Sequence, residues 1–257
     1  MQGFQKVVGH QEIITHLQNA ISMNKVSHAY LFGGESGSGK KMMASLFAMT
    51  LQCEKHGVEP CMECPSCKKA QSQNHPDIIY VKHEKPNTIS IDEIREQLIN
   101  DVMIKPYSSP YKIYIIDEAQ KLTLQAQNAL LKTIEEPPAY AVVMLLADNP
   151  DALLPTISSR CVQLNLKPVG DQLVKDYLMN EMHVPDYQAE VDASLAQGNI
   201  GKAERIARSP EYEETLESAL RMAKYADSMP LYEIVETIKK LTAEKDNIDD
   251  YFDIFSL

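Results

Sequence analysis

The chain has 257 residues, 44% of them hydrophobic, which is enough for one or two folded domains with substantial cores. Its 25 basic and 36 acidic residues leave a net charge of −11, so it lacks the basic excess with which a protein grips a nucleic-acid backbone unaided. No stretch approaches the roughly 18 apolar residues of a membrane span, and the N-terminus lacks a signal-peptide core, which indicates a cytoplasmic protein without membrane contact.

The N-terminal part of the chain predicts a helix, a strand, a loop and a second helix in succession. Apolar residues at helical spacing predict an amphipathic helix over residues 11–23, and residues 28–32 form a short apolar strand. A glycine-rich loop follows, Gly33-Gly-Glu-Ser-Gly-Ser-Gly-Lys40. The run 41–52 predicts a helix whose methionines are expected to pack in the core.

The glycine-rich loop has the pattern of a phosphate-binding loop with one departure. Such loops bind phosphate because successive backbone N–H groups converge on an anion at a helix N-terminus, while a lysine reaches the outer phosphates. Gly34, Gly39 and Lys40 match the pattern. Lys41 stands where a Ser or Thr hydroxyl would bind Mg²⁺. The sequence therefore predicts a phosphate cradle that lacks one metal ligand.

A cluster of cysteines follows the second helix. Four of the five cysteines have the spacing C-x7-C-x2-C-x2-C: Cys53, Cys61, Cys64 and Cys67. Two overlapping C-x-x-C steps suit four thiolates around a tetrahedral Zn²⁺, and with all four positions filled the site would be structural. A disulfide pair fits a reducing compartment less well. His56 and His75, the other candidate ligands nearby, are expected at the surface.

Strands and helices then alternate up to residue 166. The expected strands are 77–81, 111–116, 141–147 and 162–166. A capping box, Ser90 with Glu93, begins one helix, and another is expected over 124–134. With the strand before the loop, this alternation predicts an α/β P-loop domain with a parallel five-stranded sheet over residues 1–166, carrying a zinc module at about 53–67.

Helical patterns take over after Lys167-Pro168. Three short helices are expected at 171–182, 186–196 and 200–207, forming a lid over residues 167–207. Further helical runs at 211–226 and 231–243 and an aromatic end at 251–257 predict the start of a third helical unit, cut short, over 208–257. That last segment holds 6 basic and 12 acidic residues, more than half of the acidic excess of the chain.

Three further residues, Asp117, Glu118 and Arg160, carry candidate chemistry. Asp117 and Glu118 follow the strand 111–116, which we expect to be central, and a carboxylate there could hold Mg²⁺ through water while its neighbour orients a water for attack. Acidic residues are common at strand ends, but the upstream phosphate loop strengthens this interpretation. Arg160 precedes the last strand, where it is either an ordinary surface residue or a guanidinium offered to another subunit's nucleotide.

With these features assembled, the chain resembles the subunits of the bacterial DNA polymerase III clamp loader, which are members of the AAA+ class. The resemblance covers residues 1 to about 207. It rests on Val7-Val-Gly-His10, the segment from His28 to Lys40, the four cysteines, Asp117-Glu-Ala119, the run Asn128-Ala-Leu-Leu-Lys-Thr-Ile-Glu-Glu-Pro137 and Leu154-Pro-Thr-Ile-Ser-Ser-Arg-Cys161.

The resemblance implies a set of site residues. The implied nucleotide-binding residues are Val8, Gly34, Gly37, Gly39, Lys40, Lys41, Asn149 and Lys202. Arg160 would act in trans on the ATP of a neighbouring subunit, and Asp117 and Glu118 would be vestigial catalytic residues. The implied cofactor is a structural Zn²⁺ held by the four cysteines, while the binding of ATP with Mg²⁺ by this chain stays open.

That family contains two kinds of subunit with similar sequences. One is an ATP-hydrolysing motor, called gamma or tau. The other is a delta-prime subunit, which in many members no longer hydrolyses nucleotide. Three features favour delta-prime: Lys41, the acidity of the chain, and Gly201, which stands where the motor carries a phosphate-sensing arginine. The implied partners are the motor and delta subunits and, indirectly, the sliding clamp and primed DNA. The alternative is the motor itself, with Lys40, Asp117 and Glu118 catalytic.

Overall fold

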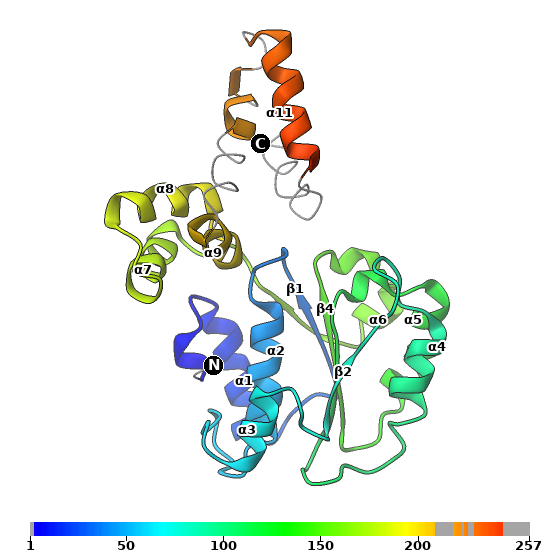
Figure 1. Ribbon diagram of the computed structural model, residues 1–257. Helices are drawn as coiled ribbons and strands as arrows, with labels where there is room; N and C mark the ends of the chain where they lie inside the picture. Colours follow the sequence, from blue (N-terminus) through cyan, green and yellow to red (C-terminus); the bar gives the residue numbers. More distant parts are fainter. Residues whose placement is uncertain (1–2, 209–217, 223, 226–228, 244–257) are drawn as a thin grey trace. The chain divides into compact units, whose positions relative to one another are not determined.

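A five-stranded parallel sheet forms the centre of the first of two units into which the chain divides, at Pro168 and Val169 (Figure 1). The computed structural model describes residues 3–208, 218–222, 224–225 and 229–243. The strands are β1 (Ala29–Gly33), β2 (Ile78–Val81), β3 (Lys112–Ile116), β4 (Ala141–Ala147) and β5 (Val162–Asn165), in the order β2-β3-β4-β1-β5. Every neighbouring pair is parallel. The predicted α/β fold with a parallel five-stranded sheet is confirmed.

The strand order corrects one prediction, because β4 and not β3 lies at the centre of the sheet. All seven residues of β4 are apolar and buried, as expected of a strand covered on both faces. Its register pairs Val143 with Ala29 on one side and with Tyr114 on the other. Asp117 therefore follows an inner strand that lies one position away from the centre.

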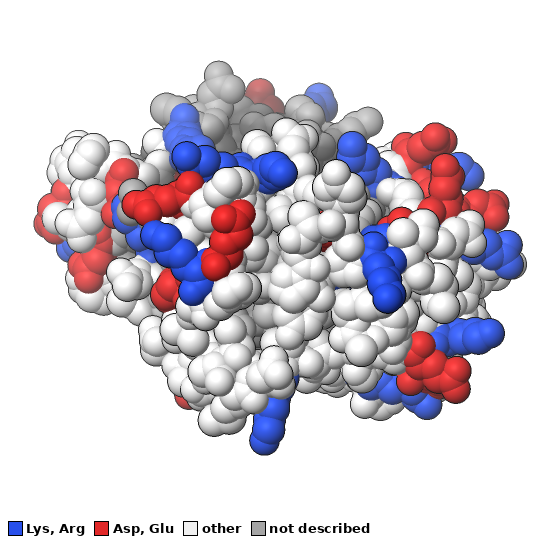
Figure 2. Space-filling view, turned by 90° about the horizontal axis from the view of Figure 1, so that it is seen from below, with Lys and Arg blue, Asp and Glu red and all other residues white. Residues whose placement is uncertain are grey.

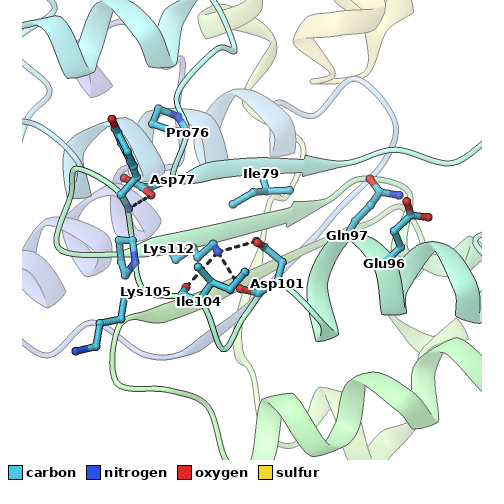
Figure 3. A pocket seen from close by; sticks show the side chains of 11 residues that line it. Pro76, Asp77, Ile79, Glu96, Gln97, Asp101, Ile104, Lys105 and Lys112 are labelled. Carbon is cyan, nitrogen blue, oxygen red and sulfur yellow. Dashed lines mark hydrogen bonds and ion pairs between the residues drawn. The ribbon is translucent and has the colours of Figure 1, made fainter.

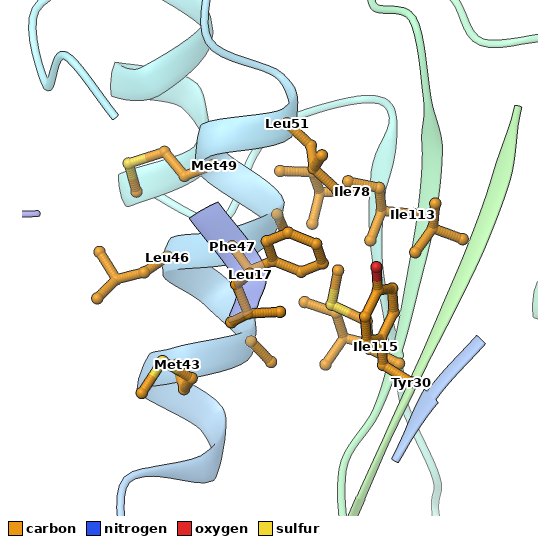
Figure 4. Packing of buried hydrophobic residues seen from close by; sticks show 14 of the residues in the cluster. Leu17, Tyr30, Met43, Leu46, Phe47, Met49, Leu51, Ile78, Ile113 and Ile115 are labelled. Carbon is orange, nitrogen blue, oxygen red and sulfur yellow. The ribbon is translucent and has the colours of Figure 1, made fainter. Parts of the chain in front are cut away.

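One face of the sheet is covered by α1 (Gln11–Ser22), α2 (Lys40–Leu51) and α3 (Pro65–Gln71) (Figures 1 and 4). Met43 and Met49 of α2 are buried in this core, as predicted, whereas Met42, for which the same packing was predicted, is exposed. Phe47 meets the ring of Tyr30 edge-on at 5.1 Å between centroids. The helix α3 was not predicted; it begins at Pro65, directly after Cys64, whose sulfur accepts a hydrogen bond from the backbone of Cys67.

The opposite face is covered by α4 (Ile91–Ile94), α5 (Leu124–Glu135) and α6 (Pro155–Ser158). The predicted capping box is present, since Ser90 Oγ accepts from the Glu93 N–H and the Glu93 carboxylate accepts from the Ser90 N–H. The helix continues as a wider π turn, η2 (Arg95–Ile99), which the pattern did not predict. Short 3-10 helices occur at η1 (Phe4–Lys6), η3 (Ala119–Lys121) and η4 (Pro150–Ala152).

The second unit is helical where it is described. The helices α7 (Asp171–Glu181), α8 (Asp186–Ala196) and α9 (Ile200–Arg208) agree with the three helices expected there and share a small apolar core. The helix α11 (Leu231–Ala243) matches the run expected at 231–243. The aromatic end at 251–257 and most of the run 211–226 lie outside the described residues. Across the part of the chain that the structure describes, no helix has the length and apolarity needed to cross a membrane.

Candidate nucleotide site and metal centre

The strand order brings three polar segments together at one edge of the sheet. The phosphate loop follows β1, Asp148 follows β4 and Asp117 follows β3, and these three strands are neighbours. The carboxyl ends of parallel strands lie at the same edge, and ligands bind there where the strand order reverses, which here is at β1. The sheet thus places two carboxylates beside the loop.

The loop has the backbone conformation of an anion-binding nest. Gly34, Gly37 and Gly39 adopt φ angles of 145°, 86° and 94°, which side chains with a Cβ rarely adopt. The helix α2 begins directly after the loop, at Lys40. The hydroxyl of Ser38 is buried and has no hydrogen-bond partner among the described residues. The nest and this unsatisfied hydroxyl would fit a phosphate group.

Gly34 is the loop position where a side chain is least tolerated. A Cβ there would lie 2.6 Å from the Leu166 carbonyl oxygen, a backbone atom that cannot rotate away. We expect Gly34→Ala to lower the free energy of unfolding by about 2 kcal/mol or more, measured by urea unfolding. Gly57→Ala is the control, because a Cβ at Gly57 meets its nearest atom at 3.5 Å; an equal effect of both substitutions would contradict this account.

Lys40 makes three contacts inside the chain. Its ammonium donates to the carbonyl oxygens of Gly34 and Glu35, each at 2.7 Å, and to Asp148 Oδ1 at 2.6 Å. The side chain of Lys40 is only 8% exposed. Asp148 was not among the residues predicted from the sequence. The signal that identifies it is its place directly after the buried strand β4, the same signal that singled out Asp117.

The other predicted catalytic groups are also paired with cations. Lys41 Nζ lies 3.0 Å from Asp117 Oδ2, so an ammonium sits beside the carboxylate predicted to hold Mg²⁺. Glu118, which has a left-handed φ of 51°, contacts His83 Nε2 at 3.3 Å and Lys121 Nζ at 2.5 Å. Within the described structure, Asp117 and Glu118 each have a lysine partner, and Glu118 also contacts an imidazole.

Arg160 lies far along the sheet from the phosphate loop. It precedes β5, and the register pairs Val162 at the start of β5 with Tyr30, while Gly33 at the loop pairs with Asn165 at the end. That separation is three residues of strand, on the order of 10 Å. The guanidinium contacts Glu135 Oε1 at 2.9 Å and donates to the Thr156 carbonyl oxygen, and its side chain is 41% exposed. Arg160 is thus not part of this chain's own loop site.

The remaining predicted nucleotide-binding residues are dispersed. Val8 is half-buried and lies two residues before His10, whose ring is hydrogen-bonded to the Ser38 backbone of the loop. Burial lowers the pKa of His10, and this hydrogen bond opposes the shift. Asn149 is exposed, and its side chain accepts from the Asp151 N–H at 3.0 Å. Lys202 is a buried residue of α9 in the second unit.

The four predicted cysteines meet in space and are not disulfide-bonded. All four sulfurs lie within 4.8 Å of one another, and the sulfurs of Cys61 and Cys67 are 3.9 Å apart. Sulfurs about 2.3 Å from a shared tetrahedral Zn²⁺ would lie about 3.8 Å apart. Backbone N–H groups of Cys61, Cys64 and Cys67 point at the sulfurs of Cys53, Cys61 and Cys64, as is suited to thiolate ligands. The cluster is able to hold a structural metal ion such as zinc.

The histidine next to the cluster corrects a prediction. His75 is buried, not at the surface: its Nε2 lies 3.0 Å from Ser66 Oγ, and its Nδ1 accepts from the Asp77 N–H. Burial lowers the pKa of His75, so its neutral form is favoured. Its hydrogen bonds join Ser66 of α3 to Asp77, which directly precedes β2. His56 is exposed, as predicted.

A cavity of about 620 Å³ lies at the other edge of the sheet, at the amino ends of β2 and β3 (Figure 3). Two of the charged residues that line it, Lys112 and Asp77, are partnered within the chain. Lys112 contacts the Asp101 carboxylate at 2.8 Å and the carbonyl oxygens of Asp101 and Ile104, while Asp77 accepts from the backbone of Tyr107 and Ser108. This cavity is separate from the phosphate loop, because it opens at the opposite ends of the strands.

Comparisons with known proteins show the family to which the chain is similar. Residues 9–170 match the family described as DNA polymerase III, delta subunit. The DNA polymerase III subunit tau of Bacillus subtilis (strain 168) is 38% identical over 208 residues, which is 79% of this chain and 36% of tau. The DNA polymerase III subunit delta′ of the same organism is 35% identical over 207 residues, which is 80% of this chain and 61% of delta′.

The fold also has counterparts among solved structures. The Thermotoga maritima RuvB Holliday junction branch migration motor aligns with 98% of this chain and 74% of its own, with a TM-score of 0.53 and 17% identity, a likeness of fold alone. The chain spans less than two thirds of the length of the tau and delta′ relatives. The fold is AAA+-like, and the chain belongs to the DNA polymerase III family of clamp-loader subunits that includes delta′, gamma and tau.

Proposed function

We propose that this chain is the delta′ kind of clamp-loader subunit, which does not hydrolyse ATP and supplies an arginine to the neighbouring motor. The observation that carries this proposal is that Lys41 replaces the metal-binding hydroxyl and lies beside Asp117. The position of the metal-binding hydroxyl holds an ammonium instead, and that ammonium pairs with the carboxylate on which a magnesium ion would depend. Without the ion, the charge that develops during phosphoryl transfer lacks its main stabilisation.

The position of Arg160 supports a role in trans. The Arg160 side chain is 41% exposed near the sheet edge and lies at the end of β5 remote from the chain's own loop. An arginine placed in this way serves a phosphate only if another subunit brings that phosphate to it. Its contact with Glu135 would then hold the side chain in place until a more strongly charged partner arrives.

The charge distribution on one face of the chain is consistent with a subunit that meets DNA through its partners. On the face shown in Figure 2, Lys and Arg side chains are interspersed with Asp and Glu and do not form a continuous basic stripe. We propose that motor and delta subunits supply the contacts to primed DNA and to the sliding clamp, while this chain acts as a rigid element of the ring. The proposed domains are the P-loop domain over 1–166, the lid over 167–207 and a helical unit from 208 onward.

The ATP-hydrolysing motor is the second candidate. It is favoured by the retained phosphate nest and Lys40, and by identities to tau and delta′ that differ by only three percentage points, 38% against 35%. In that case Lys40, Asp117 and Glu118 would be catalytic, and ATP would bind with Mg²⁺. The argument against it is Lys41 itself, which offers no hydroxyl to a metal and places an ammonium 3.0 Å from Asp117 Oδ2.

Phosphate release by the purified chain distinguishes the two candidates. We expect no ATP hydrolysis above background, with or without Mg²⁺, because the site lacks a metal-binding hydroxyl. Glu118→Gln is the matched variant, since it removes only the carboxylate that would orient the attacking water. Hydrolysis at the rate of a clamp-loader motor that disappears in Glu118→Gln would overturn the proposed function in favour of the motor.

A further inference from the structure

The lysine of the phosphate loop already has an anionic partner inside the chain. An ammonium group has three N–H donors, and Lys40 directs them at three acceptors: the carbonyl oxygens of Gly34 and Glu35 and the carboxylate of Asp148. The contact with Asp148 is the shortest of the three, at 2.6 Å, and it is charge-assisted. Lys40 therefore has no donor left for a phosphate in this arrangement.

The carboxylate of Asp148 is itself held in position. Gln120 donates from its side-chain amide to Asp148 Oδ2 at 3.1 Å and accepts from the Asp148 N–H at 3.2 Å. Asp148 also follows directly on β4, the central and fully buried strand of the sheet, so its backbone is fixed at the edge where the loop lies. One carboxylate oxygen thus faces Gln120 while the other faces Lys40.

We propose that Asp148 acts as an internal counter-anion of the phosphate loop and determines how weakly the loop binds nucleotide. A bound nucleotide has to break the contact between Lys40 and Asp148, and it has to place its phosphates beside a carboxylate of like charge. The rest of the cradle is intact, since the glycine nest and the unpartnered Ser38 hydroxyl are present. This inference rests on the proposed function, in which the chain does not complete hydrolysis.

The second ion pair at the site is expected to matter less. Lys41 and Asp117 have side chains that are 58% and 39% exposed, whereas Lys40 is nearly buried. Water and salt screen an exposed pair, so breaking it costs little. The contact between Lys40 and Asp148 is shielded on the lysine side, and this contact is the one that a phosphate must replace.

The test is an ATP titration of the full chain and of Asp148→Asn, without and with Mg²⁺. Asparagine has the same shape and keeps an oxygen for Lys40, but it removes the negative charge. We expect the affinity for ATP to rise by on the order of 10- to 100-fold, and inorganic tripolyphosphate to show the same gain because the effect lies at the phosphates. Asp151→Asn removes the same charge three residues further on, away from Lys40, and should change the affinity less than about twofold.

Two further variants keep the test decisive. Lys40→Ala in the Asp148→Asn background should abolish the gain, since the gain depends on the released ammonium. Asp148→Ala is measured as well, so that a folding defect of one substitution, detected by thermal melting, does not prevent a conclusion. An unchanged affinity in folded Asp148 variants overturns the inference. A lower affinity for ATP with Mg²⁺ also overturns it, because Asp148 would then serve the metal.

The outcomes for the two proposals are separable. ATP hydrolysis by the unmodified chain would contradict the proposed function whatever the Asp148 variants do. No hydrolysis together with an unchanged affinity in Asp148→Asn would overturn only the role of Asp148. A large gain in affinity without hydrolysis supports both, because it shows that the counter-anion limits binding while the missing hydroxyl limits the chemistry.

Discussion

Replacing Arg160 by alanine is expected to reduce ATP hydrolysis at the site next to this chain by on the order of a thousandfold in a reconstituted clamp loader. The planar guanidinium would stabilise the charge that spreads over the phosphate oxygens during transfer, and alanine offers nothing in its place. The ATP turnover of the complex should therefore fall by the amount that this one site contributes. Steady-state phosphate release by the assembled complex, with and without primed DNA, measures the effect.

Two controls separate a role in trans from a structural one. Arg160→Lys keeps the charge but loses the forked pair of donors, so a large part of the defect should remain. Glu135→Gln removes the internal partner of Arg160 at 2.9 Å while leaving the guanidinium in place, and turnover should stay near its normal value. If Glu135→Gln reproduced the defect of Arg160→Ala, the arginine would act only through its contact inside this chain. Unchanged turnover in Arg160→Ala would reject the trans role outright.

Replacing Cys64 by serine is expected to prevent zinc binding at the four-cysteine cluster and to destabilise the first unit. Structural zinc sites contribute folding free energy directly, and a loss of several kcal/mol would lower the melting temperature by on the order of 10 °C. The effect should extend beyond the cysteines because the module is tied to its surroundings. Glu59, between the first two cysteines, accepts from the Phe4 N–H at 2.8 Å and from the Gln18 amide at 2.6 Å.

The fifth cysteine provides a matched control for this substitution. Cys161 lies outside the metal cluster, and burial raises the pKa of its thiol to about 12, so it stays protonated. Cys161→Ser should leave zinc bound at one ion per chain, measured by elemental analysis, and should change the melting temperature by far less than Cys64→Ser. Full zinc occupancy in Cys64→Ser, or an unchanged melting curve after chelation of the metal, would contradict a structural metal in this cluster.

The sequence predicted the regular strands and helices of the fold better than the irregular or very short ones. Continuous apolar runs identified the strands, and the Ser90–Glu93 capping box identified the start of a helix, because both signals are local and periodic. The π turn at Arg95–Ile99 and the helix Pro65–Gln71 were missed. The π turn departs from the 3.6-residue period of an α-helix without a local sequence signal. The helix Pro65–Gln71 begins inside the cysteine segment, which the spacing of its cysteines indicated only as a metal-binding module.

Some features of the candidate site follow from short stretches of sequence, and others depend on contacts between residues that are far apart in the chain. The glycine nest, the missing hydroxyl and the set of four cysteines are properties of short segments, so the amino-acid sequence by itself determined them. The tertiary structure alone decided that Asp148, 108 residues from Lys40, is its ionic partner, that His75 is buried, and that Arg160 lies at the far end of β5. These contacts depend on the strand order and on packing between distant segments, and residue spacing along the chain does not encode either.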